Sequence, residues 1–207
     1  MLNRYARALF TRAVTPIARV LLAAGIGPDL VTAVGTLGVV VGALTFYPRG
    51  EFLAGTLVIL VFVFFDLLDG TMARLAGRSS RWGAFLDSTL DRVGDASVFG
   101  GLVLWYAGAG HDPTMAAVAL VALVAGAVVS YARARAEGLG MTADVGIAER
   151  AERLVVVLLT TGLAGLGVPY VQPAGVWLVA VAGVVTVVQR VVVVRRQSVA
   201  EPDGPTP

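Results

Sequence analysis

Six long apolar runs, separated by short polar or proline-containing breaks, form the main pattern of the chain. They cover residues 31–47, 52–68, 85–106, 114–131, 154–166 and 176–194. Breaks such as Pro48-Arg49-Gly50 separate consecutive runs. Because a helix needs about 20 apolar residues to cross a bilayer, the pattern predicts six transmembrane helices over residues 25–196.

The two ends of the chain depart from this pattern. In residues 1–24, Arg4 and Arg7 share one arc of a helix with Arg19, while Leu9 and Ile17 lie on the opposite arc. This arrangement predicts an amphipathic helix that lies in the membrane interface. Residues 197–207 carry three of the nine prolines, and we expect them to form a disordered cytoplasmic tail.

Composition supports the same class of protein. The 207 residues are 57% hydrophobic and only 14% charged, with a mean hydropathy of +0.82. A soluble domain would be about a quarter charged, so a soluble enzyme and a nucleic-acid-binding protein are both disfavoured. The absence of cysteine excludes thiolate metal sites and disulfides. The chain is therefore predicted to be an all-α integral membrane protein, with six transmembrane helices preceded by an amphipathic interfacial helix.

The arginines predict the orientation in the membrane. If the N-terminus is cytoplasmic, nearly all of them fall on the cytoplasmic side, with Arg49 on the other side and Arg92 within the third run. Such an asymmetry is what the positive-inside rule describes. We therefore expect a multi-pass protein of the cell membrane with both termini in the cytoplasm.

Four aspartates stand where a membrane protein should carry few charges. Asp66 and Asp69 are three residues apart at the inner end of the second run, and Asp87 and Asp91 are four apart at the start of the third. Each pair shares one helix face, and consecutive antiparallel helices can bring the two faces together. Asp95 continues the second face one turn deeper.

Four carboxylates in one cleft repel each other unless some are protonated or cations bind among them. A site with oxygen ligands only suits Mg²⁺ or Mn²⁺. Two such ions would neutralise four carboxylates, and a two-metal site stabilises in-line displacement at phosphorus. A purely structural alternative also exists, since the aspartates could pair with Arg74, Arg78 or Arg92.

The spacing of these residues resembles a known family. Asp66-x-x-Asp69-Gly70-x-x-Ala73-Arg74, eight residues, then Gly83-x-x-x-Asp87-x-x-x-Asp91 matches the signature of the CDP-alcohol phosphotransferases at every fixed position. The resemblance implies that an acceptor hydroxyl attacks the lipid-bearing phosphorus of a CDP-alcohol and releases CMP. It also implies that the four aspartates hold two ions and that Asp91 takes the proton of the hydroxyl.

The same resemblance implies contacts with the CDP-lipid. The residues concerned lie in the opening turn of the first run and around the motif: Asp29, Leu30, Val31, Thr32, Gly70, Arg74 and Ser80. Gly70 would let the backbone approach the nucleotide, and a guanidinium such as that of Arg74 suits phosphate binding. Asp29 or Thr32 could instead cap the first helix.

Arginines near the inner ends of the later runs concern the acceptor. They are Arg133, Arg135, Arg153 and Arg190. The positive-inside rule alone could explain them. However, Tyr131-Ala-Arg133-Ala-Arg135 and Glu149-Arg150-Ala-Glu152-Arg153 resemble the bacterial phosphatidylinositol phosphate synthases, which implies inositol 1-phosphate as the acceptor. Arginines alone do not separate this phosphate from glycerol 3-phosphate or another phosphorylated alcohol.

Two further alternatives concern transport and assembly. The carboxylates could line the path of a cation transporter, but they cluster at the cytoplasmic end, and the outer halves of the helices offer few polar groups. Gly38-x-x-x-Gly42 permits close helix packing, within one chain or across a dimer. The family resemblance implies a homodimer. The other expected partners are the two substrates and the surrounding lipids, and the composition suggests no nucleic-acid partner.

Overall fold

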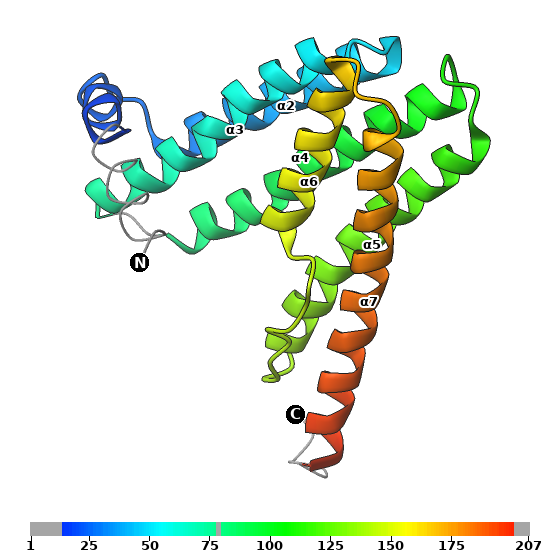
Figure 1. Cartoon of the computed structure of the whole chain (residues 1–207). Coiled ribbons are helices and arrows are strands. Elements are labelled where there is room, and N and C mark those ends of the chain that lie inside the picture. Colours follow the sequence, from blue (N-terminus) through cyan, green and yellow to red (C-terminus); the bar gives the residue numbers. More distant parts are fainter. Residues whose placement is uncertain (1–13, 78–79, 201–207) are drawn as a thin grey trace, which may run out of the picture. The chain divides into compact units, whose positions relative to one another are not determined.

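The computed structural model describes residues 14–77 and 80–200, with the backbone alone for Asp66 and Leu67. Every regular element in this part of the chain is a helix, which confirms the all-α prediction. The elements are a helix over Val14–Ala23, α2 (Pro28–Phe46), the 3₁₀ helix η1 (Tyr47–Arg49), α3 (Phe52–Leu75), α4 (Arg81–Ala107), α5 (Pro113–Glu137), α6 (Arg150–Gly165) and α7 (Val171–Ala200) (Figure 1).

Four of the described helical segments are long and apolar enough to cross a membrane, as expected of a membrane protein. They are α2 together with η1, α3, α5 and α7. The other two predicted runs correspond to α4 and α6. In α4 the first half carries Asp87, Asp91, Arg92 and Asp95, and α6 has only 16 residues, fewer than the roughly 20 that a straight span needs.

At both ends of the described chain, the observed helices can be compared with the predicted boundaries. In the helix Val14–Ala23, Val14 and Ala18 are buried while Ile17 and Val20 are exposed. At the other end, α7 continues past Gln197 to Ala200, so the helix reaches beyond the predicted start of the tail. Gln197 is anchored there, because its side-chain Nε2 donates to the backbone oxygen of Thr142 at 2.6 Å. Residues 1–13 and 201–207 lie outside the described part.

The chain divides into two compact units. The first comprises residues 1–46 and 54–98, and the second comprises residues 47–53 and 99–207, so that α4 passes from one to the other. In the first unit, Val14 and Ala18 pack against Val31 of α2 and against Leu68 and Met72 of α3. This cluster holds the end of α3 that carries the aspartate motif.

Close packing of α2 on α3 depends on glycines. A Cβ added at Gly38 would lie 2.2 Å from the ring of Phe62, and one at Gly42 would lie 3.0 Å from Val58. Small residues of this kind allow helices to approach closely in membranes. Of the two uses predicted for the Gly38-x-x-x-Gly42 pair, the structure therefore shows the one within a single chain.

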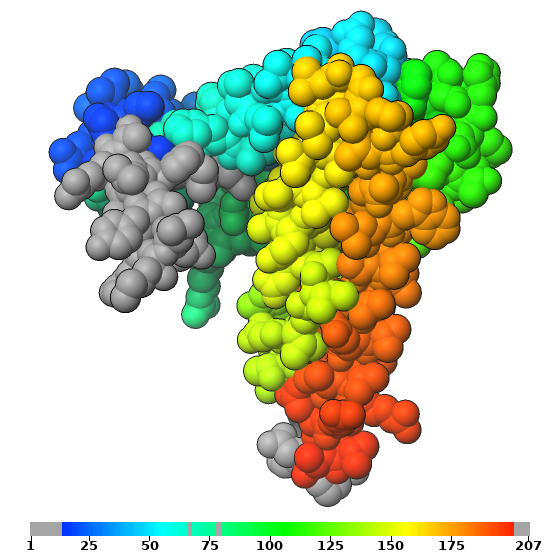
Figure 2. Space-filling model, in the orientation of Figure 1, coloured from blue at the N-terminus to red at the C-terminus, as the bar shows by residue number. Residues whose placement is uncertain are grey.

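In the second unit, α5 and α6 both pack against α7 (Figures 1 and 2). Gly175 of α7 lies against Thr160 of α6, where an added Cβ would come within 2.2 Å of the hydroxyl oxygen. Tyr106, near the end of α4, donates its hydroxyl to the side-chain oxygen of Gln172 at 3.0 Å. Asp112 caps α5 by accepting from the backbone N–H of Met115 at 2.9 Å.

Candidate active site

The aspartate motif lies entirely in the first unit. Asp66 and Asp69 are in the second half of α3, and Asp87 and Asp91 are in the first half of α4. Asp69 is only 5% exposed, Asp91 is partly buried and Asp87 is exposed. For Asp66 the structure describes the helical backbone alone.

Asp69 is tied to α2 by a hydrogen bond that sequence reasoning did not anticipate. The Thr32 hydroxyl donates to Asp69 Oδ2, and its oxygen also lies 3.1 Å from the backbone oxygen of Pro28. Since α2 begins at Pro28, Thr32 and Asp29 stand inside the helix rather than at its N-cap.

Arg92 lies beside one of the motif aspartates. Its Nη2 lies 3.7 Å from Asp91 Oδ2. Arg74 instead donates to the Thr71 hydroxyl at 3.1 Å, and Arg78 lies outside the described residues. The structural alternative thus has support at one position of the motif, since the Arg92 guanidinium lies beside the carboxylate that is predicted to act as the base.

The chemistry of the donor set fits a hard divalent cation. The motif offers carboxylate oxygens, and the chain has no cysteine and a single histidine. Among the side chains that the structure describes, which exclude that of Asp66, no three carboxylates or histidines come close enough together to hold a metal ion. The expectation of a divalent cation therefore rests on the type of ligand and on the placement of both aspartate pairs in the first unit.

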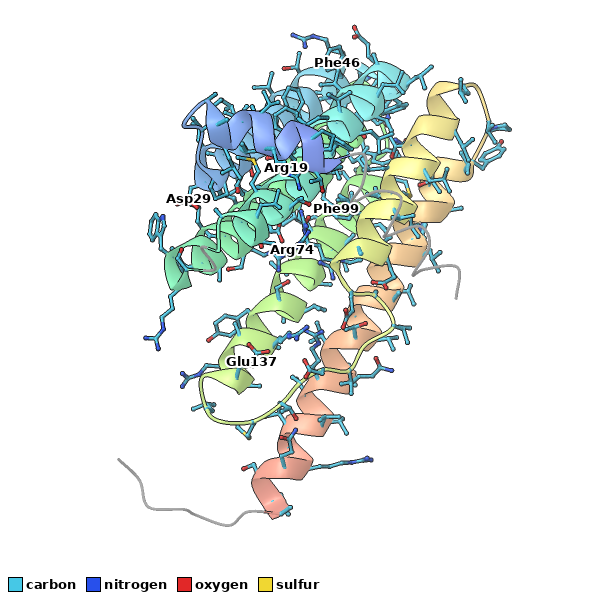
Figure 3. All side chains as sticks on the ribbon, turned by 90° about the vertical axis from the view of Figure 1, so that its left-hand side faces the viewer. Arg19, Asp29, Phe46, Arg74, Phe99 and Glu137 are labelled. Atoms are coloured by element: carbon cyan, nitrogen blue, oxygen red, sulfur yellow. The ribbon has the colours of Figure 1, made fainter. Side chains whose placement is uncertain are left out.

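Asp29 and Ser80 both lie beside Gly83, which has no side chain. Ser80 accepts from the N–H of Gly83 at 2.8 Å, in the first turn of α4. A Cβ added at Gly83 would lie 3.2 Å from the Ser80 hydroxyl and 3.6 Å from Asp29 Oδ1. Gly83 of the motif thus lies beside two of the residues predicted to contact the CDP-lipid. Figure 3 labels Asp29 and Arg74 in this unit.

The remaining predicted nucleotide-binding residues have different surroundings. Leu30 is 57% exposed, whereas Val31 belongs to the buried core. Gly70 is close to Arg74, since an added Cβ would lie 3.7 Å from Arg74 Nη1. Arg74 itself is exposed, so its guanidinium is accessible to a ligand.

The four arginines predicted for the acceptor belong to the second unit, and two of them are buried. Arg153 and Arg190 are each 2% exposed, whereas Arg133 and Arg135 are exposed. Arg190 donates to the backbone oxygens of Val145 at 2.9 Å and Val129 at 2.6 Å. Burial of two guanidinium groups is more than the positive-inside rule requires, because that rule is satisfied by arginines in water.

Three of these arginines contact one connecting segment, the α5–α6 loop (residues 138–149). Arg133 Nη2 lies 2.9 Å from Asp144 Oδ1, and Arg153 Nη1 donates to the backbone oxygen of Ala148 at 2.8 Å. Arg190, besides its bond to Val145, lies 3.7 Å from the carboxylate of Glu149. Figure 3 labels Glu137 where α5 ends and this loop begins. For Arg135 the structure gives an exposed position and no comparable anchor.

The motif and its placement in the fold agree with one family. The chain belongs to the CDP-alcohol phosphatidyltransferase family, whose family model matches residues 26–188. This match spans the aspartate motif and three of the four arginines, Arg133, Arg135 and Arg153, and it ends two residues before Arg190. It confirms the predicted phosphotransferase, and the cation-transporter alternative receives no support.

Similar proteins carry a more particular name. The chain is 57% identical over 213 residues to the phosphatidylinositol phosphate synthase of Streptomyces avermitilis, covering 100% of this chain and 87% of the relative. It is 48% identical over 198 residues to the phosphatidylinositol phosphate synthase of Cutibacterium acnes, covering 92% and 96%.

Solved structures agree with these relatives. A crystal structure of Mycobacterium tuberculosis phosphatidylinositol phosphate synthase with CDP-DAG bound matches with a TM-score of 0.86 at 46% identity, covering 88% of this chain and 94% of that chain. A second structure of that protein, in complex with manganese and citrate, matches with a TM-score of 0.85 at 46% identity, covering 88% of each.

Proposed function

We propose that this protein transfers the phosphatidyl group from CDP-diacylglycerol to inositol 1-phosphate, giving phosphatidylinositol phosphate and CMP. The observation that carries the proposal is the identity of 57% to a phosphatidylinositol phosphate synthase over the whole chain. It is supported by the intact aspartate motif and by two buried arginines in the second unit.

Asp66, Asp69, Asp87 and Asp91 would hold two divalent cations, Mg²⁺ or Mn²⁺. Bound cations would neutralise the donor pyrophosphate and the departing CMP. Manganese in the homologous M. tuberculosis structure supports a divalent ion of this class. Thr32 would keep Asp69 in one orientation, because its hydroxyl bonds one of the two carboxylate oxygens.

Asp91 would act as the general base. The hydroxyl oxygen of the acceptor forms a new bond to the phosphorus that carries diacylglycerol, and the bond from that phosphorus to the oxygen of CMP breaks. Asp91 takes the hydroxyl proton, and CMP leaves with the electron pair. Asp29, Ser80 and Gly83 would contact the nucleotide, together with Gly70 and Arg74.

Arg133, Arg135, Arg153 and Arg190 would bind the phosphate of the acceptor. Guanidinium groups form short, charge-assisted hydrogen bonds with a phosphate dianion. Free inositol lacks this group, so the site should discriminate against it.

For the architecture, we propose six membrane spans, formed by α2 to α7, with both termini and the active site in the cytoplasm. Helices α4 and α6 fall on predicted apolar runs, and the charges of α4 gather at its cytoplasmic end. A homodimer is also proposed, on the family resemblance.

An acceptor competition tests the function. Purified protein is given CDP-diacylglycerol, Mg²⁺ and equal concentrations of inositol 1-phosphate, glycerol 3-phosphate and free inositol, and the lipid products are separated. We expect phosphatidylinositol phosphate to be the main product. A predominance of phosphatidylglycerol phosphate would contradict the acceptor assignment while leaving the family reaction intact.

A further inference from the structure

The α5–α6 loop helps to orient the two buried arginines, Arg153 and Arg190. Arg153 of α6 donates to the backbone oxygen of Ala148 at 2.8 Å, and Arg190 of α7 donates to that of Val145 at 2.9 Å. Both carbonyls belong to the same short stretch of loop. The contacts that hold this stretch in place therefore help to set the direction of the two guanidinium groups.

One hydroxyl holds that stretch against α7. Thr186 is fully buried, and its Oγ1 accepts from the backbone N–H groups of Ile147 at 3.2 Å and Ala148 at 3.1 Å. The same hydroxyl donates to the oxygen of Ala182 at 2.8 Å, one turn earlier in α7. The hydroxyl thus uses both its accepting and its donating capacity.

Two glycines leave room for Thr186 and for Arg153. Gly146 has φ +152°, and an added Cβ there would lie 2.4 Å from the methyl group of Thr186. Gly126 of α5 lies beside Arg153, where an added Cβ would be 3.2 Å from Nε. The loop therefore packs directly on Thr186, and α5 leaves room for the guanidinium. Figure 2 shows the loop, coloured yellow-green, lying against α7.

We propose that Thr186 is a positioning residue for the acceptor site. Its hydroxyl fixes the backbone at residues 147 and 148, and the carbonyl of Ala148 in turn orients Arg153, while the adjoining carbonyl of Val145 orients Arg190. Thr186 is not placed in contact with substrate. The inference rests on the proposed function, because it assigns these arginines to the acceptor phosphate.

The test compares Thr186→Val, which keeps the shape of the side chain and removes the hydroxyl, with Thr186→Ser, which keeps the hydroxyl. Loss of the hydroxyl removes the acceptor of two backbone N–H groups, of which that of Ala148 is buried. We expect Thr186→Val to raise the KM for inositol 1-phosphate by about tenfold or more, with the KM for CDP-diacylglycerol changed less than about twofold. Thr186→Ser should restore the KM for inositol 1-phosphate to near the wild-type value.

Thr161→Val is the matched control. Thr161 is also fully buried, on α6, and its hydroxyl has no hydrogen-bond partner among the residues that the structure describes. A general effect of removing a buried hydroxyl would move both substrates' KM values in this variant too, whereas the proposal expects neither to move. If Thr186→Val does not fold, Thr186→Ala replaces it, since alanine and serine at this position differ by the hydroxyl alone.

The outcomes separate the inference from the proposed function. If the wild-type protein makes no lipid from inositol 1-phosphate, the proposed function fails and this inference with it. If the wild type is active but Thr186→Val lowers only the melting temperature, or shifts both KM values alike, the positioning role is overturned and the proposed function stands. Equal KM values for Thr186→Ser and Thr186→Ala would overturn it as well.

Discussion

Asp91 combines two proposed roles, metal ligand and general base, and the substitution Asp91→Asn tests the second. Substitution Asp91→Asn keeps the shape of the side chain but removes its ability to accept the hydroxyl proton. Loss of a general base lowers rates by roughly 10²–10⁴-fold, and we expect a loss in this range, measured as CMP release. Asp95→Asn is the control, because Asp95 lies one turn further along α4 and outside the motif. Activity above about a tenth of the wild-type value in Asp91→Asn would contradict the assignment.

A substitution of Arg153 tests the proposed binding of the acceptor phosphate. Charge-assisted hydrogen bonds contribute about 1.5–3 kcal/mol each, so we expect Arg153→Gln to raise the KM for inositol 1-phosphate about tenfold or more and the KM for CDP-diacylglycerol much less. Arg196→Gln is the control, since Arg196 is an exposed arginine near the end of α7. If both variants lose only protein yield, the arginines serve orientation in the membrane instead.

At the residue scale, the sequence predicted the class of reaction but not the tertiary contacts of the side chains. The aspartate spacing identified the chemistry because i,i+3 and i,i+4 pairs define a helix face without tertiary information. The Thr32–Asp69 hydrogen bond and the Thr186 contacts to the α5–α6 loop depend on the register between helices far apart in the chain. Apolar periodicity does not contain that register, and so these contacts could not be predicted.

At the scale of helices, the packing of α2 on α3 gives a stability prediction. The Cβ of Gly38→Ala would overlap the ring of Phe62, which lies 2.2 Å from that position. Overpacking costs about 1–3 kcal/mol, so we expect a lower melting temperature in detergent. Gly100→Ala in α4 is the control, because no atom lies within 4 Å of its added Cβ and alanine favours helices by about 1 kcal/mol. Equal shifts in the two variants would argue against close α2–α3 packing.

The cation site proposed for α3 and α4 gives a second prediction at this scale. Asp66 and Asp69 of α3 and Asp87 and Asp91 of α4 supply only oxygen ligands, which favour Mg²⁺ or Mn²⁺ over softer metals. Thorough chelation should therefore stop CMP release, and either cation should restore it. A calcium-only or chelator-insensitive reaction would rule out the proposed site.

At the scale of the whole molecule, the sequence predicted the class and the helix positions. Predicted and observed helices coincide because long apolar runs must form helices in a membrane. The number of spans is a different matter, since it depends on whether the charged half of α4 and the 16 residues of α6 reach through the bilayer. Hydropathy alone favours four clear spans, whereas the complete run pattern and the arginine asymmetry favour six.

The two topologies place the turn between α4 and α5 on opposite sides of the membrane. With the N-terminus in the cytoplasm, six spans put Ala109 outside, while spans at α2, α3, α5 and α7 alone keep it inside. Because the chain has no cysteine, single cysteines at Ala109, Leu166 and Ser198, all exposed positions, can report their side through a membrane-impermeant maleimide applied to intact cells.

We expect Ala109→Cys to be labelled in intact cells and Ser198→Cys only after lysis. Leu166→Cys is the positive control, because it lies outside in both topologies. Labelling of Ala109→Cys only after lysis, with Leu166→Cys still labelled in intact cells, would contradict six spans and favour four. Labelling of Ser198→Cys in intact cells would reverse the orientation and place the basic ends of the helices outside, against the electrostatic bias that the arginines impose.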